Sequence, residues 1–85
     1  MVLETKLSSA ALKYIQALDR VTQERVKDKL KELAADPFNI RTSKPLVGSH
    51  KRTCRVGAYR ILFVIEGKIL LVSDVGPRGQ IYRKA

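Results

Sequence analysis

The second half of the chain places arginines and a tyrosine where they could meet a phosphate-rich ligand. Arg55 and Arg60 fall in neighbouring predicted strands. Arg78 follows in a Gly-Pro-Arg-Gly turn, and Tyr82 comes four residues later. Guanidinium groups bind phosphates, and a tyrosine ring can stack on an unpaired base for roughly 1–3 kcal/mol. These residue types together favour contact with single-stranded RNA.

A family resemblance described below implies RNA cleavage without a metal ion, and these residues fit that chemistry. The 2′-hydroxyl attacks the adjacent phosphate, so one group must help remove its proton and others must hold the added negative charge. Preorganised arginines could stabilise that charge by about 2.7–4 kcal/mol for each donor. Arginine is a poor base, so proton removal would need Tyr82 or Lys51 with a pKa lowered by neighbouring positive charge. Tyr82 therefore has two open roles, general base or base-stacking residue.

Charge points to the same kind of ligand. Seventeen Lys and Arg against eight Asp and Glu give a net charge of +9 and a pI near 10.1. Residues 1–40 hold seven basic and six acidic groups, whereas residues 41–85 hold ten basic and two acidic groups. Nearly all of the excess therefore lies in the second half, which is typical of a surface that binds a polyanion.

Length and composition exclude several other classes of protein. Eighty-five residues make one domain, 1–85. One cysteine, Cys54, and one histidine, His50, without clustered carboxylates, predict no metal site, and we expect no small-molecule cofactor. No apolar run is long enough for a membrane helix, and the N-terminal residues lack the order of a secretory signal. We therefore expect a cytoplasmic protein with no membrane partner.

Two helices are predicted before residue 37. Ser8 or Ser9 can cap the first helix, and Thr22 can cap the second through its hydroxyl. Apolar residues recur at helical spacing through both segments. Pro37 ends the second helix, because proline disfavours helical geometry in the residue before it.

The remaining pattern predicts strands. A short extended segment covers 2–6, and three strands follow at 51–56, 59–65 and 68–75, with turns at Gly57-Ala58 and Glu66-Gly67. The expected class is α+β, with two N-terminal helices packed on one face of a four-stranded, mainly antiparallel sheet. Cys54 should face the helices as a small core residue. The predicted core is Leu12, Ile15, Leu18, Val26, Leu30, Leu33, Ile61, Phe63, Ile69 and Leu71.

Three segments carry a family resemblance. The run from Arg55 to Leu62 (RVGAYRIL), then Asp74 to Arg78 (DVGPR) and Ile81-Tyr82-Arg83, resemble stretches of the RelE/ParE superfamily of toxins from toxin–antitoxin systems. Chain length, basic charge and element order agree over essentially the whole chain. The resemblance implies a RelE-like fold and the activity of RelE, a ribosome-dependent endoribonuclease (mRNA interferase) that cleaves mRNA in the ribosomal A site without a metal.

The resemblance also implies roles for individual residues. Arg60 matches the arginine of the family's Tyr-Arg pair, Arg78 the arginine after Val-Gly, and Tyr82 the late tyrosine. These three are the expected catalytic residues, and the expected RNA-binding residues are Lys51, Arg52, Arg55 and Arg83. Thr53 stands where RelE has a second lysine, and Pro77 and Gly79 replace more polar residues around the turn arginine.

The expected partners are the ribosome, mRNA and an acidic, RelB-like antitoxin whose helix covers Arg60 or Arg78. Two other functions stay open: a ParE-like toxin that binds and inhibits DNA gyrase without catalysis, and an inert nucleic-acid-binding module. A purely structural role for Arg60, in an ion pair with Asp74, is a further alternative. His50 is expected to be solvated or to touch phosphate.

Overall fold

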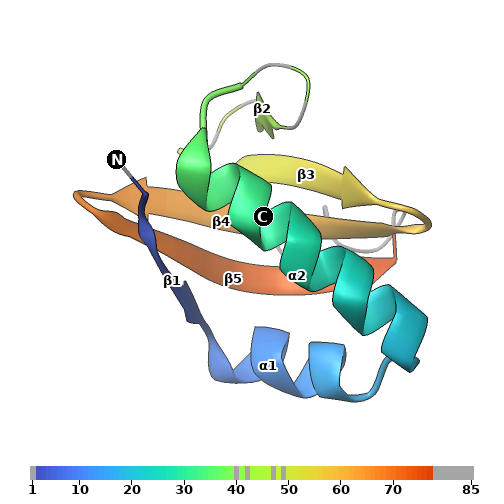
Figure 1. The fold of residues 1–85 in the computed structure, drawn as a ribbon. Helices are drawn as coiled ribbons and strands as arrows, with labels where there is room; N and C mark the ends of the chain where they lie inside the picture. The colour runs from blue at the N-terminus through green and yellow to red at the C-terminus, as the bar shows by residue number, and fades with distance from the viewer. Residues whose placement is uncertain (1, 40, 42, 47, 49, 78–85) are drawn as a thin grey trace.

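The structure is a computed structural model that describes residues 2–39, 41, 43–46, 48 and 50–77. One strand, two helices and four further strands follow one another along the chain, with α2 lying across the sheet and α1 below β5 (Figure 1). In chain order they are β1 (Glu4–Leu7), α1 (Ser9–Gln16), α2 (Arg20–Ala35), β2 (Lys44–Pro45), β3 (Arg52–Val56), β4 (Tyr59–Glu66) and β5 (Ile69–Pro77).

The sheet has the order β1-β5-β4-β3-β2. The strands β2 to β5 pair antiparallel with their neighbours, whereas β1 runs parallel to β5 with Glu4 opposite Ile69. The α+β class and the two helices on one face are confirmed. The strand count was one too low, because Lys44 and Pro45 pair with Thr53 and Arg52 within a segment predicted to be a loop.

Capping explains where the helices begin. The Ser8 hydroxyl accepts a hydrogen bond from the amide of Ala11, which confirms one of the two predicted caps of α1. The prediction for α2 was wrong: Asp19, not Thr22, is the cap. The Asp19 carboxylate accepts from both the amide and the hydroxyl of Thr22, at 3.1 and 2.6 Å. A charged acceptor at a helix start binds two donors and is favoured by the helix dipole.

The core lies between the helices and β3, β4 and β5. Six of the predicted core residues are buried there: Ile15, Val26, Leu30, Leu33, Ile61 and Phe63. Leu18 is half-buried against this core. Leu12 was predicted wrongly, since 43% of it is exposed on the outer side of α1.

Two further core predictions were wrong because of a turn. The hairpin turn occupies Gly67 and the residue after it rather than Glu66-Gly67, so Glu66 pairs with Ile69. Gly67 has a φ of +59°, which glycine adopts without strain. Side chains alternate across a strand, so this register turns Leu70 and Val72 toward the helices in place of Ile69 and Leu71.

Strand β4 is covered on both faces, as its continuous apolar run predicts. Ile61 and Phe63 face the helices, while Leu62 and Val64 are buried on the opposite face. A bulge in the pairing with β5 lies between Leu62 and Phe63. None of the described helices is long and apolar enough to cross a membrane.

Candidate nucleic-acid interface

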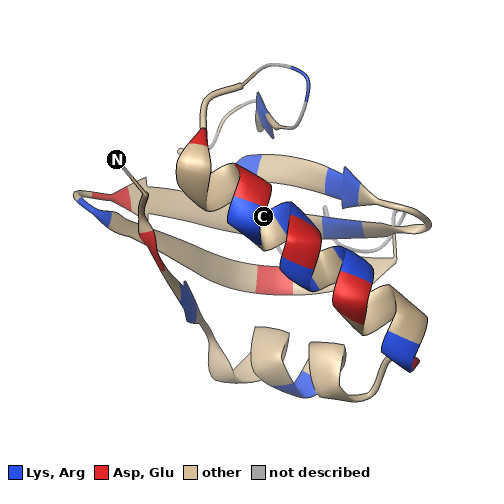
Figure 2. Ribbon diagram, in the orientation of Figure 1, with Lys and Arg blue, Asp and Glu red and all other residues tan. Residues whose placement is uncertain are grey.

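The face of each candidate side chain follows from its place in its strand. Tyr59 contacts Tyr14 of α1 edge to face, with ring centroids 6.1 Å apart, so the first residue of β4 points toward the helices. Arg60, the next residue, therefore lies on the opposite face. Arg55 is the register partner of Arg60 and shares that face with Thr53, two residues earlier on β3. Basic bands mark both strands near this end of the sheet (Figure 2).

Arg55 and Arg60 differ sharply in their surroundings. Arg60 is only 8% exposed, in a strand of buried neighbours. Arg55 is exposed, and its Nε donates to the carbonyl of Gly57 at 3.2 Å. The guanidinium group of Arg55 therefore lies in solvent and that of Arg60 within the fold, although the two residues are opposite each other on adjacent strands. We call this pair, together with the exposed surface around Arg55, the arginine face.

Thr53 and Asp74 lie on the same side of the sheet as the arginine face. Thr53 is buried and uncharged, so it adds no cation to this face. Asp74 is half-buried on β5 and lies opposite Leu62 of β4. The residue directly opposite Arg60 is Gly76, two positions after Asp74. An acidic side chain thus lies on the same face of the sheet, one step diagonally from Arg60.

The other candidates are placed apart or lie outside the described residues. Arg52 is on β3, but strand alternation puts it on the helix side, where its guanidinium lies 5.1 Å from the centre of the Phe38 ring. Lys51 immediately precedes β3 and is half-buried. The remaining candidates, Arg78, Tyr82 and Arg83, fall beyond Pro77 and outside the described residues. The described fold therefore brings together Arg55 and Arg60 and separates them from Arg52.

No group of three His, Cys, Asp or Glu side chains that could hold a metal ion occurs among the residues that the structure describes. Cys54 is buried on the helix side, as predicted. Burial raises the pKa of its thiol to about 11, which keeps the sulfur protonated at neutral pH. This cysteine is a packing residue rather than a nucleophile.

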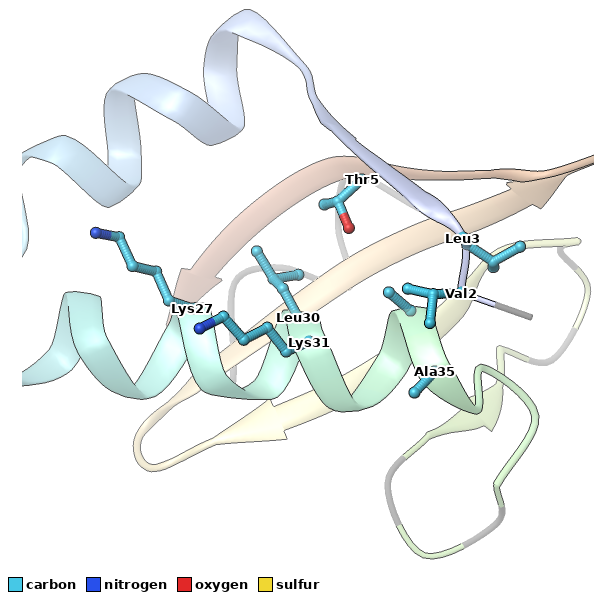
Figure 3. A pocket seen from close by; sticks show the side chains of 8 residues that line it. Val2, Leu3, Thr5, Lys27, Leu30, Lys31 and Ala35 are labelled. Carbon is cyan, nitrogen blue, oxygen red and sulfur yellow. The ribbon is translucent and has the colours of Figure 1, made fainter.

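A second surface, not predicted from the sequence, is a groove between β1 and α2. Its volume is about 520 Å³. Apolar side chains of α2 and of the two residues before β1 line it, and the ammonium groups of Lys27 and Lys31 extend along its rim (Figure 3). The lining residues are Val2, Leu3, Thr5, Lys27, Leu30, Lys31, Ala34 and Ala35. The i,i+4 spacing of these two lysines is visible in the sequence, but the same spacing is typical of any solvated helix face.

Solved structures share this fold. The toxin–antitoxin complex RelBE2 from Mycobacterium tuberculosis matches with a TM-score of 0.80 at 20% identity, covering 92% of this chain and 100% of that one. The intact RelBE complex of E. coli matches with a TM-score of 0.75 at 26% identity, covering 88% and 95%. The YoeB dimer from Staphylococcus aureus has a TM-score of 0.72 at 15% identity, covering 87% and 94%.

These likenesses show a RelE-like fold, and a family match confirms the RelE/ParE superfamily as the class of protein. Residues 5–82 match the family described as the ParE toxin of the type II toxin–antitoxin system parDE. The chain belongs to this family and is a toxin of a type II toxin–antitoxin system. No curated protein sequence matches it.

Proposed function

We propose that this toxin is a ribosome-dependent endoribonuclease that cleaves mRNA in the A site by metal-free attack of the 2′-hydroxyl. One observation carries the proposal: Arg55 and Arg60 are register partners on the sheet face that the helices leave uncovered. Like charges directly opposite on a sheet destabilise it, so a sheet selected only for stability would avoid the pair. A phosphodiester bound between the arginines would offset that repulsion. The match to the E. coli RelBE complex at 26% identity supports the same activity.

The two arginines have different roles in this mechanism. Arg55, being exposed, meets the incoming phosphate. Arg60 is buried, and a charge interacts more strongly where the local dielectric is low. Arg60 therefore stabilises the negative charge that develops on phosphorus oxygens during attack. Arg78 and Tyr82 are proposed to act with it, Arg78 on the same charge and Tyr82 as general base or as a stacking residue.

Primer extension on mRNA in a translating extract tests the proposal. Purified toxin should produce cuts in phase with codons, and Arg55→Ala, Arg78→Ala and Tyr82→Ala should each reduce them. Arg60→Lys is preferable to alanine at that buried position, because it keeps the charge while removing the planar fork of donors. Lys68→Ala, which removes one charge from the distant β4–β5 turn, is the matched control.

Inhibition of DNA gyrase is the second candidate function, because the matching family is that of ParE toxins. Inhibition of gyrase by binding alone would need no catalytic tyrosine. Inhibited DNA supercoiling with intact mRNA would favour this function and would contradict cleavage. The two assays can be run on the same preparation of toxin.

The proposed protein partner is the cognate antitoxin, and the β1–α2 groove is its proposed docking site. Several of the structural relatives are named as complexes of a RelE-type toxin with its antitoxin. The groove offers apolar walls beside Lys27 and Lys31. A segment of the antitoxin with apolar side chains toward Leu30 and carboxylates over the two lysines would match both features. The position over Arg60 or Arg78, expected from the resemblance, is the alternative docking site.

A further inference from the structure

An aromatic side chain is held in place at the surface beyond the end of α2. Phe38 is 61% exposed although it is one of only two phenylalanines in the chain. The guanidinium carbon of Arg52 lies 5.1 Å from its ring centre, within the range of a cation–π contact. The ring thus has a cation beside it and still exposes most of its area.

The guanidinium group is itself fixed by the segment that carries Phe38. Arg52 Nε and Nη2 donate to the hydroxyl of Ser43 at 3.2 and 3.1 Å, and Ser43 is buried. The Ser43 hydroxyl donates in turn to the carbonyl of Pro37 at 2.8 Å, so it is donor and acceptor at once. These bonds join Arg52 to the residue before Phe38. Ring and guanidinium are therefore ordered before any ligand arrives, which lowers the entropy cost of binding.

The charge around this pair favours an anionic ligand. The partners of Arg52 just described are a hydroxyl and a ring, both neutral, so they leave its positive charge available. Arg41 and Lys44 are exposed on the same segment. Two acidic residues, Asp36 at the C-cap of α2 and Glu32, line a hollow with Arg41. Glu32 pairs with Lys29 at 3.1 Å. Basic groups exceed acidic ones here, even with both acids counted.

We propose that Phe38 and Arg52 form a stacking site for one unpaired nucleobase, with the flanking phosphate bound by the basic residues beside it. A nucleobase presents a flat π-face to the ring and a phosphate to the cations, which suits both halves of the site. The site is separate from the arginine face, because Arg52 and Arg55 project from opposite faces of β3. The inference rests on the proposed function, in which the toxin meets RNA.

The absence of tryptophan from the sequence allows a direct test. Phe38→Trp places a single fluorescent indole in the site, and short single-stranded RNA is the probe. Stacking of a base on the indole should quench its emission. The same oligonucleotide with abasic residues keeps the phosphates and should not quench. Val21→Trp is the matched control, since Val21 is 65% exposed on α2.

Affinity measurements separate stacking from charge. Phe38→Ala should weaken RNA binding by about 5- to 150-fold with the salt dependence unchanged, whereas Arg41→Ala should reduce the salt dependence. Phe38→Tyr should keep binding near that of the wild type. Single-stranded DNA is the second probe. Stacking tolerates either sugar, so quenching by both nucleic acids supports the site, as does quenching by RNA alone.

Several results would overturn the inference. They are equal quenching of the indole at positions 21 and 38, quenching that persists with abasic RNA, and unchanged affinity of folded Phe38→Ala. A response of Trp at 38 to antitoxin but not to RNA would assign the site to the protein partner instead. Primer extension separates a failure of this inference from a failure of the proposed function. Codon-phased cuts without quenching would reject only the stacking site. Quenching without cuts would reject only the nuclease activity.

Discussion

Arg55 on β3 and Arg60 on β4 lie directly opposite each other. The Arg55 side chain is exposed, whereas Arg60 is buried, with 8% of its surface exposed. Their separation is fixed by backbone pairing rather than by flexible loops. Two like charges on one face of a sheet repel each other. Under the proposed function, we expect a bound phosphate to offset this repulsion, and the effect of the repulsion on stability can be measured.

We predict that Arg55→Ala raises the stability of the toxin while lowering its cleavage activity. Loss of the repulsion should raise the free energy of unfolding by about 0.2–1 kcal/mol at low salt, and the gain should shrink in 0.5 M salt as the charges are screened. Loss of a donor to the phosphate should slow cleavage by about 100- to 1,000-fold. Thermal unfolding at two salt concentrations and primer extension measure the two effects.

Lys68→Ala is the control for this prediction, because it removes the same charge from a turn away from Arg60. It should leave cleavage near the wild-type rate. Equal stabilisation by Lys68→Ala and Arg55→Ala would show that net charge, and not the cross-strand pair, is responsible.

Charge reversal at the groove should weaken the antitoxin complex. The double change Lys27→Glu, Lys31→Glu places two carboxylates along the rim of the β1–α2 groove, where they would repel the acidic antitoxin. We expect affinity to fall by about tenfold, mostly through slower association that depends on salt. Surface plasmon resonance with the cognate antitoxin measures both rates.

The matched control is Lys13→Glu, which reverses an exposed charge on α1 outside the groove. Equal weakening by Lys13→Glu would indicate a general effect of charge. Unchanged binding of the double variant would place the antitoxin elsewhere, and Arg55→Glu would then test the arginine face.

The sequence predicted the fold well where one pattern dominated. The apolar run of β4 and the stop at Pro37 gave a central strand and a helix end, because burial and proline geometry act locally. The sequence-based predictions were wrong where the result depended on which residues pair between neighbouring strands. A turn displaced by one residue exchanged Leu70 for Ile69, and a two-residue strand at Lys44 exists only because β3 lies beside it.

The same limit applies to the candidate site. Alternation along β3 correctly places Thr53 and Arg55 on one face, but the expected RNA-binding set joined Arg52 to Arg55, and the structure puts these two on opposite faces. The burial of Arg60 depends on everything packed around β4, which no local pattern encodes. The groove beside Lys27 is lined by residues more than twenty positions apart in sequence, so it appears only when β1 lies next to α2.

The Cys54 thiol should resist modification in the folded toxin. It is 1% exposed with a pKa of about 11, so both access and thiolate content are low at pH 8. We expect iodoacetamide to label it at least 100-fold more slowly in native buffer than in denaturant. Mass spectrometry of time points gives both rates, and comparable rates would contradict the placement of Cys54 in the core.

Titration of the same thiol should destabilise the fold at high pH. Its folded pKa lies above the ordinary value of 9.0, so the fold favours the protonated form. This contribution is complete below pH 9 and is lost as the pH rises toward 11. Cys54→Ala would abolish the dependence on this group, and chemical denaturation of both proteins between pH 8 and 11 measures it. An identical loss in both would assign it to other groups, such as the lysines.

The Asp19 cap should make the stability of α2 depend on pH in the opposite direction. The hydroxyl and the amide of Thr22 both donate to the carboxylate and lower the pKa of Asp19 below its ordinary value. A lowered folded pKa stabilises the fold above the unfolded pKa, near 3.8, and this stability is lost as the pH falls through the folded value. Asp19→Asn keeps an acceptor without a titrating group, so its melting temperature should vary less between pH 5 and pH 2 than that of the wild type.

Asp19→Ala removes the acceptor and should melt lower at pH 7, because the amide of Thr22 loses its cap. Circular dichroism melts of the three proteins across this range test the assignment, and equal melting of wild type and Asp19→Ala at pH 7 would contradict it.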